Sequence, residues 1–392
     1  MEILPRTIGT RPRLACEVRA EGIVAARAED ASAVLSAVSR VTLQDGVAVP
    51  HLRTGEAGVT VASEAGNSAA NGIIGGIGAS AAGRTKLVEA VRSALEAVVL
   101  KTREVTLIVP DSAVRVLLLD FDELPAKADE ALPVVRFRLK KLLPFDADDA
   151  AVSYQITGTS KGIVQVIAVA MPREVLADYE NVVREAGFEP GAVLPSTLAA
   201  LAGLSEGEIP LLVVNAGSEG VTTAIVKGNS LLLHRTVDLG ADPHGLVRTD
   251  DPPVVPVNEQ TSDSSIAAIA ARLAAAGTRA PVVAAQVQVN AVETVIEASL
   301  ESPSSEVAQA VSVAAAYFED TLQTAPAVVL SAGPMGADAL MAVLDEAYIG
   351  MGTVAVQEMV ERQMLGAGTG SAGQPGGVPL GWLAGVRGAL AN

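Results

Sequence analysis

Few residues of this chain have the types and spacings that chemistry at a site requires. Its three histidines lie far apart in the sequence and show no metal-ligand spacing: His51, His234 and His244. Cys16 is the only cysteine, which excludes an internal disulfide framework and a cysteine-cluster zinc site. The irregular glycine-rich stretch 72–83 is not followed by Gly-Lys-Ser or Gly-Lys-Thr, so it is not a phosphate-binding P-loop. We therefore expect no catalytic residue and no metal site.

One basic cluster contrasts with the acidic remainder of the chain. It consists of four cations near the end of a predicted helix: Arg136, Arg138, Lys140 and Lys141. A solvated helix face, with cations placed favourably near the C-terminal end of the helix dipole, explains the cluster without a function. A docking surface for an acidic partner segment or for the inner face of a membrane explains it as well. The residues alone leave both interpretations open.

The composition of the chain limits the kinds of partner that it can bind. The chain has 392 residues, a formal net charge of −17 and 49% hydrophobic residues. This hydrophobic content predicts a large core, and the negative charge argues against nucleic acid, because phosphate backbones attract Lys and Arg. No uncharged apolar run reaches the roughly 18 residues that a membrane-spanning helix needs. We expect a soluble, cytoplasmic protein.

The elements that must position any site alternate between helices and strands, which predicts an α/β fold. Helices are predicted at 84–100, 126–143, 172–187, 195–204, 265–276, 291–300, 304–322, 335–347 and 380–391. Strands are predicted at 13–18, 23–27, 40–50, 105–110, 115–119, 162–170, 209–214, 220–226, 231–237, 328–331 and 354–359. Loops or linkers are predicted at 54–83, 248–265 and 366–377.

Two segments of the chain are similar to each other. Residues 14–26, Leu-Ala-Cys-Glu-Val-Arg-Ala-Glu-Gly-Ile-Val-Ala-Ala, align with residues 212–224, Leu-Val-Val-Asn-Ala-Gly-Ser-Glu-Gly-Val-Thr-Thr-Ala. Each pattern predicts a strand, a polar turn that ends in Glu-Gly, and a second strand. Chance similarity between two hairpins is one explanation. The other is a duplicated domain in which each half opens with a hairpin beside a shared cleft.

That duplicated architecture is the actin-like one, and the order of further segments resembles the PilM family of type IV pilus assembly proteins. The resemblance rests on Leu124-Pro125, on the helix that ends Lys-Lys-Leu-Leu-Pro-Phe at 140–145, on a strand around Tyr154, and on the segments 179–199, 305–339 and 380–390. The segment 179–199 resembles the family's succession of helix, glycine, strand and helix. It covers most of the chain. It implies an actin-like, ribonuclease H-like α/β fold of two domains, with an extra subdomain in the first half.

The resemblance also implies the domain boundaries. The first actin-like domain is expected at 1–205, with the inserted subdomain at about 101–186. The second is expected at 206–365, with a Pro- and Asp-rich loop and a small helical lobe at about 241–303. Residues 366–392 are expected to form a Gly-rich linker and a terminal helix that returns to the first domain.

The loops that bind nucleotide in this family are altered here. Where the family has Asp-x-Gly after its first strand, this chain has Glu17-Val18-Arg19, and the second Asp-x-Gly is Asn215-Ala216-Gly217. Glycine lets backbone N–H groups approach phosphate and aspartate positions metal-bound water, so we expect both phosphate loops to be broken and turnover of ATP to be negligible. Weak binding of ATP and Mg²⁺ is left open, since a guanidinium can itself hold a phosphate. The residues of the degenerate loops would be Glu17, Arg19, Asn215, Gly217, Ser218 and Gly333.

The resemblance implies a non-catalytic scaffold of a type IV pilus or type II secretion-like machine, peripheral at the inner membrane. Its implied partners are the N-terminal cytoplasmic peptide of a bitopic inner-membrane protein (PilN in the family), pilus motor ATPases and further copies of itself. The peptide is expected in a groove beside the subdomain at 101–186. Two alternatives stay open: an active actin-like ATPase or kinase that binds nucleotide, and a membrane-tethered division scaffold like FtsA.

The last predicted helix contains Trp382, the only tryptophan. Four residues at helical spacing predict its buried face: Leu380, Leu383, Val386 and Leu390. A membrane anchor would need a basic polar face, and Arg387 is the only cation. We expect this helix to pack in the core of the first domain.

Overall fold

The structure is a computed structural model that describes most of the chain. The described residues are 12–30, 32–44, 47–52, 81–160, 162–205, 207–239, 303–347, 354–366 and 378–391. The chain divides into two compact units, Met1–Leu239 with Val307–Asn392, and Gly240–Glu306. The predicted helices at 265–276 and 291–300, the loop at 248–265 and nearly all of the loops at 54–83 and 366–377 lie outside the described residues.

The first half contains a five-stranded sheet in the order β3-β2-β1-β4-β8. Its strands are β1 (Leu14–Arg19), β2 (Gly22–Ala28), β3 (Leu35–Thr42), β4 (Glu104–Val109) and β8 (Glu189–Pro195). β1 to β3 form an antiparallel meander, whereas β1, β4 and β8 run parallel. The predicted strand at 40–50 is therefore wrong in position, because the alternation of buried Leu35 and Ala37 with less buried neighbours puts this strand earlier.

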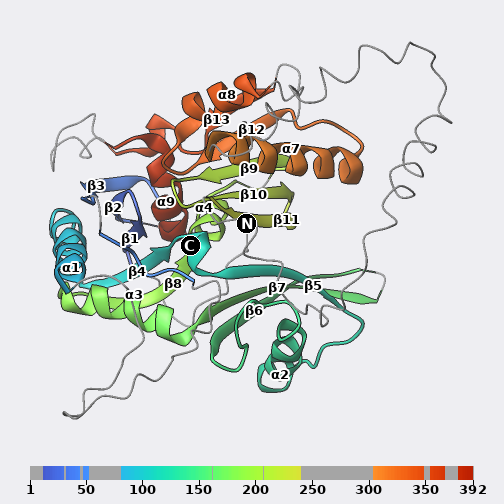
Figure 1. Cartoon of the computed structure of the whole chain (residues 1–392), viewed down its shortest axis with the longest axis horizontal. Coiled ribbons are helices and arrows are strands. Elements are labelled where there is room, and N and C mark those ends of the chain that lie inside the picture. The colour runs from blue at the N-terminus through green and yellow to red at the C-terminus, as the bar shows by residue number, and fades with distance from the viewer. Residues whose placement is uncertain are drawn as a thin grey trace, which may run out of the picture. The chain divides into compact units, whose positions relative to one another are not determined.

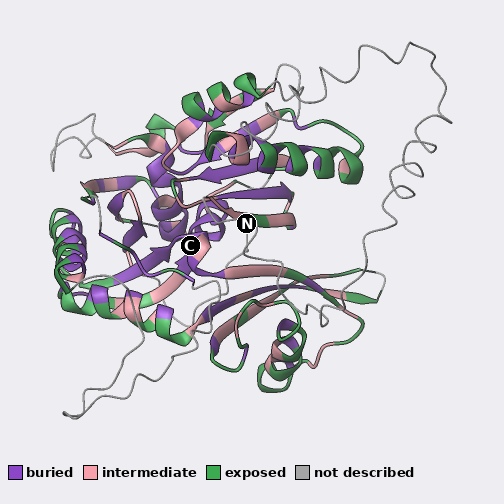
Figure 2. Ribbon diagram, viewed as in Figure 1, coloured by how far each residue is buried: buried purple, intermediate pink, exposed green. Residues whose placement is uncertain are grey.

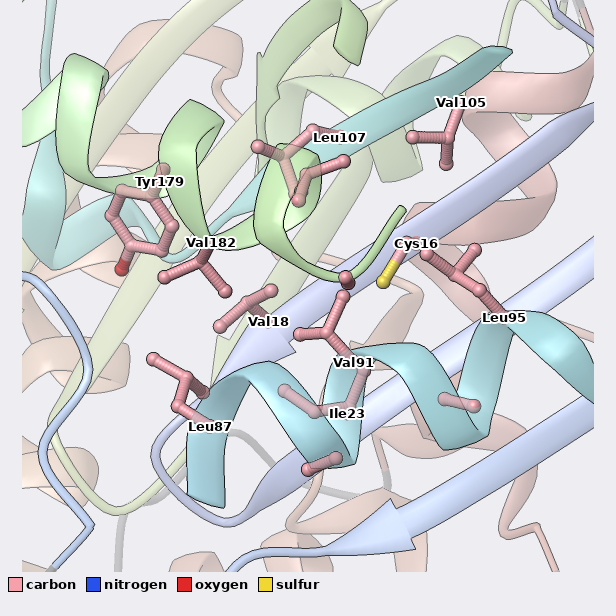
Figure 3. Packing of buried hydrophobic residues seen from close by; sticks show 14 of the residues in the cluster. Cys16, Val18, Ile23, Leu87, Val91, Leu95, Val105, Leu107, Tyr179 and Val182 are labelled. Carbon is pink, nitrogen blue, oxygen red and sulfur yellow. The ribbon is translucent and has the colours of Figure 1, made fainter. Parts of the chain in front are cut away.

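Two helices, α1 (Ala81–Glu96) and α3 (Arg173–Glu185), pack on this sheet. Figure 3 shows Leu87, Val91 and Leu95 of α1 beside Cys16 and Val18 of β1. Every residue of β1 is buried, as expected of a central strand that is covered on both faces. In Figure 2 the central strands of the sheet are mostly purple, whereas the outer faces of α1 and α3 are green.

The second half repeats this pattern in the order β11-β10-β9-β12-β13. Its strands are β9 (Leu211–Ala216), β10 (Gly220–Lys227), β11 (Ser230–Asp238), β12 (Val328–Ala332) and β13 (Ala355–Glu358). β9 pairs antiparallel with β10 and parallel with β12, as β1 does with β2 and β4. The helices α7 (Pro303–Leu322) and α8 (Gly336–Glu346) contribute to its core. Since the two similar hairpins hold equivalent places in two equivalent sheets, the structure favours duplication over chance.

A smaller layer follows β4 and the 3-10 helix η1 (Asp111–Ala113). It is a three-stranded antiparallel sheet in the order β5-β7-β6, with β5 (Arg115–Phe121), β7 (Ile163–Pro172) and β6 (Ala150–Ser160). The helix α2 (Ala128–Leu139) buries Ala131, Val135 and Leu139 against it. Figure 1 shows β5, β6 and β7 at the lower right, with α2 beneath them.

Two short helices join the sheets. α4 (Ser196–Ala202) follows β8, and the 3-10 helix η4 (Leu380–Leu383) leads into α9 (Ala384–Leu390). α9 packs against α4, β1, β2 and β4, and one hydrophobic cluster contains both helices together with strands from both sheets. A further short 3-10 helix, η3 (Arg362–Met364), precedes the terminal segment.

Candidate functional site

The residues predicted from the altered loops meet where β1 and β9 end. Arg19, at the end of β1, is 6% exposed and forms an ion pair with Glu17, which is 1% exposed. Its Nε donates to Oε1 of Glu17 at 2.7 Å, and its Nη2 donates to Oγ of Ser196 at 2.6 Å. The same Nη2 donates to Oδ1 of Asn215 at 3.1 Å, so a single guanidinium links the two five-stranded sheets.

Asn215 extends this network on the side of the second sheet. Its Nδ2 lies 2.9 Å from both Oγ of Ser196 and Oγ1 of Thr197. Thr197 donates in turn to Oδ2 of Asp111 at 2.5 Å, and all of these side chains are buried. Buried polar groups that are hydrogen-bonded in this way specify one arrangement of the elements that carry them.

The backbone N–H groups of the predicted loops also have partners inside the protein. The amide of Gly217 donates to the carbonyl of Gly220 at 3.0 Å, and the amide of Ser218 donates to the carboxylate of Glu21. The amide of Gly333 donates to the carbonyl of Gly381 at 2.8 Å. The donors that a phosphate would need are thus engaged with the protein itself.

Little space remains beside this network. A pocket of about 30 Å³ opens between the two hairpins. Its lining residues are Arg19, Ala20, Glu21, Pro110, Asp111, Ser112, Asn215, Gly217, Glu219, Gly220, Thr222 and Thr236. Burial, and to a smaller extent the nearby carboxylate of Glu21, raise the pKa of Glu219. Pockets that enclose organic ligands span about 300–1,000 Å³.

Two further candidates for chemistry, Cys16 and His234, have shifted pKa values. Burial raises the pKa of the Cys16 thiol, which disfavours the reactive thiolate. Burial lowers the pKa of His234. Among the described residues, no group of three or more His, Cys, Asp or Glu side chains is arranged to hold a metal ion.

A larger groove of about 280 Å³ lies between the first five-stranded sheet and the three-stranded sheet. Its lining residues come from β4, β6, β7, β8, α3 and the segment before β5: Val109, Val114, Ala151, Val152, Ser153, Val169, Met171, Leu176, Glu180, Gly191, Val193, Leu194 and Pro195. β8 and β6 are edge strands of their two sheets. Edge strands present backbone N–H and C=O groups that their own sheet does not use. The structure thus has an apolar groove beside the segment 101–186.

The basic cluster on α2 is only partly free. Arg136 donates to the carbonyl oxygens of Ala147 and Ala150, and Lys140 forms an ion pair with Asp148 at 2.5 Å. Arg138 is exposed, and Lys141 lies 5.9 Å from the ring centroid of Phe137, a residue that is 68% exposed. Two of the four cations therefore have partners within the chain, and docking at this cluster stays a prediction.

Comparison with known proteins identifies the fold of the chain. No family model and no curated protein matches the sequence. A chain of a PilM-PilN type IV pilus biogenesis complex matches the structure with a TM-score of 0.57 and 16% identity, over 90% of each chain. The chain has an actin-like fold. The predicted fold class is confirmed.

Two further structural matches have lower TM-scores. One is the cytoplasmic domain of EpsL, an inner membrane component of the type II secretion system of Vibrio cholerae, with a TM-score of 0.33 and 13% identity over 68% of this chain and 95% of that one. The other is the ethanolamine utilization protein EutJ from Carboxydothermus hydrogenoformans, with a TM-score of 0.36 and 13% identity over 100% of this chain and 91% of that one. Within the described part of the chain, every helix is too short or too polar to cross a membrane.

Sequence reasoning missed the partners of Arg19 and Asn215 and most of the groove. A usable signal was present for Asp111, which follows the predicted strand at 105–110 directly, whereas Ser196 follows β8, a strand that only the resemblance implied. Parallel strands end at the same edge of a sheet, so polar residues just after β1, β4 and β8 meet there. The groove had no comparable signal, because its small aliphatic residues look like ordinary core residues.

Proposed function

We propose that this chain is a cytoplasmic actin-like scaffold at the inner membrane, in a type IV pilus or a type II secretion-like assembly. In this proposal it binds the N-terminal cytoplasmic peptide of a bitopic membrane protein like PilN and does not turn over nucleotide. Contacts with motor ATPases and self-association within the assembled machine belong to the same proposal.

The apolar groove carries the docking part of this proposal. It is concave, it is lined by aliphatic side chains, and edge strands border it on two sides. An extended peptide adds to a strand edge through main-chain hydrogen bonds and places alternate side chains in apolar pockets. The matched chain comes from a complex that contains PilN, which supports a bitopic partner with a short tail.

The cleft between the hairpins supports the absence of turnover. The residues there do not fit a bound Mg-nucleotide, because Arg19 and Asn215 bond to each other where a ligand would join the two halves. The amides of Ser218 and Gly333 are engaged, and the free volume of about 30 Å³ is far below that of an organic ligand site. The protein's own side chains thus take the place of a bridging ligand.

The docking proposal is tested with synthetic tails. The probes are fluorescein-labelled peptides that correspond to the cytoplasmic N-termini of single-span proteins encoded beside this gene. Fluorescence polarisation with the full chain should show saturable binding of one of them. Ser153→Trp should abolish it, because Ser153 is an exposed residue of β6 that lines the groove.

Thr159→Trp is the matched control, since Thr159 is exposed on the same strand and does not line the groove. It should bind the tail as the unmodified chain does. Circular dichroism should show that both variants fold. Equal binding by the two variants would remove the groove from the proposal, and failure of every tail to bind would remove the bitopic partner.

A further inference from the structure

We infer that Glu180 makes the groove selective for a peptide that carries a Lys or Arg side chain beside its aliphatic segment. This inference rests on the proposed function, because it gives the chemistry of the peptide that docks there. The inference concerns one lining residue, Glu180, and the proposed docking position stays the same.

Glu180 is the only ionisable side chain among the described residues that line the groove. It lies on α3 one turn after Leu176, so an apolar and an acidic side chain follow each other along the wall of the groove. Its side chain is 30% exposed, and a peptide laid over it would reduce that access to water. A carboxylate with less water around it attracts a cation more strongly than an exposed one does.

Two other acidic residues of α3 form ion pairs with a residue outside the groove. Asp178 and Glu185 both face Arg84 of α1, at 3.9 Å and 2.7 Å. Glu174 is exposed in the first turn of α3 and does not line the groove. Glu180 is therefore the acidic side chain that a cation in the groove would contact.

Glu180 already has one cationic neighbour, Arg184, whose Nη2 lies 2.8 Å from its carboxylate. This pair is on the surface, with Arg184 48% exposed, and such pairs contribute little. Arg184 also donates to Oδ1 of Asn181 at 3.2 Å, so Glu180 is not its only partner. A carboxylate accepts several hydrogen bonds, so a peptide cation can join Arg184 or displace it.

Charge complementarity selects the same class of peptide. The chain has a formal net charge of −17, which repels an acidic tail and attracts a basic one over a Debye length. Cytoplasmic segments next to a membrane span carry an excess of Lys and Arg. Complementary charge mainly sets partner choice and association rate, whereas the apolar lining supplies affinity.

The test compares four proteins and two peptides. The proteins are the unmodified full chain, Glu180→Gln, the matched control Glu174→Gln and Arg184→Ala. The peptides are the labelled tail that binds in the docking assay and the same tail with every Lys and Arg changed to Gln. Dissociation constants come from fluorescence polarisation at low and at high salt.

Glu180→Gln should weaken binding of the basic tail about tenfold, and the Gln-substituted tail should bind the unmodified chain about tenfold more weakly. The two losses should not add, because both remove the same pair. Glu174→Gln should change nothing, and Arg184→Ala should strengthen binding by freeing the carboxylate.

The outcomes separate this inference from the docking proposal. If the tail binds and Ser153→Trp abolishes binding, but Glu180→Gln and the Gln-substituted tail bind as before, the inference fails and the docking proposal stands. Weaker binding by Arg184→Ala would assign an acidic peptide to the groove and also overturn the inference. If no tail binds, or if Ser153→Trp leaves binding intact, both fail together.

Discussion

At the residue scale, the buried guanidinium of Arg19 organises the cleft. It connects Glu17 on its own strand to Ser196 on α4 and Asn215 on β9. Removing one member of a buried ion pair leaves an unpaired charge, which is costly, whereas replacing both members by apolar residues often costs little. The network therefore predicts different outcomes for single and double substitutions.

Arg19→Leu should lower the free energy of unfolding by about 3–5 kcal/mol, because the buried carboxylate of Glu17 loses its ion-pair partner and keeps only the hydrogen bond from Ser196. Leu at both positions 17 and 19 should recover most of that loss. Lys127→Leu is the control, since Lys127 and Glu130 are 73% and 56% exposed and such pairs contribute about 0–1 kcal/mol. Urea titrations measure all three, and similar losses for Arg19→Leu and Lys127→Leu would contradict a structural role for the network.

A pH dependence follows from Glu219. Burial raises its pKa above the ordinary value of 4.5, so the folded state favours the protonated form. Its contribution to stability is present below pH 4.5 and is lost as the pH rises through the raised pKa of the folded state. Glu219→Gln should thus match the unmodified chain in acid and be more stable than it near neutral pH.

Urea titrations between about pH 4 and about pH 8 measure this difference. Glu319→Gln, at an exposed position of α7, should show no such trend. A constant difference across the range for Glu219→Gln would mean that its carboxyl titrates alike in the folded and unfolded states.

Part of this site was predictable. The altered loops put Glu17, Arg19 and Asn215 in one place, because both hairpins were recognised as equivalents and a hairpin fixes where its strand ends. The sequence does not say that Arg19 turns inward to Glu17, since side-chain direction depends on neighbours from distant strands. Ser196 supplies that environment from 177 residues away along the chain.

At the scale of elements, the contact between α4 and α9 depends on glycine. A Cβ at Gly388 would overlap the carbonyl oxygen of Ala199 on α4. Both helices are short, with 7 residues each, and helices of that length need tertiary contacts to form. The close approach of the two backbones therefore stabilises both helices.

Gly388→Ala should therefore destabilise the chain by about 1–3 kcal/mol through overpacking, although Ala favours helix more than Gly does. Gly207→Ala is the control, because a Cβ there has no neighbour within 4 Å. Thermal melts followed by circular dichroism measure both. A stabilised Gly388→Ala variant would mean that α9 can shift away from α4 without cost.

Removal of residues 378–392 tests the terminal segment as a whole. Leu383, Val386 and Leu390 are at most 1% exposed, and burying each is worth about 1.5–3 kcal/mol. The truncated chain should melt at a lower temperature and aggregate more readily. Its binding to anionic vesicles should equal that of the full chain, whereas a lipid anchor would lose vesicle binding and keep its melting temperature.

Burial of Leu383, Val386 and Leu390 was predictable from the spacing of the last helix and is confirmed, whereas Leu380 is only half-buried. Trp382 is 3% exposed and lies under the guanidinium of Arg40. Periodicity placed most strands to within a few residues but gave no sign of β6, and none of β8, which contains Pro190 and Gly191. Both residues disfavour strands, and an edge position tolerates them because one side of an edge strand makes no ladder hydrogen bonds. Only the resemblance implied a strand there.

At the scale of the whole molecule, two sheets of equivalent topology meet at a cleft that the protein's own side chains fill, and a separate groove stays open. The proposed scaffold uses the groove and not the cleft. Hydrogen exchange read by mass spectrometry tests this directly, with the full chain alone, with Mg-ATP, and with the synthetic tail that binds in the docking assay.

The account predicts that the tail protects amides of β6, β8 and α3, and that Mg-ATP at micromolar concentration changes exchange nowhere. Protection of the segments 17–21 and 215–220 by Mg-ATP, or no protection along the groove when the tail is added, would contradict it.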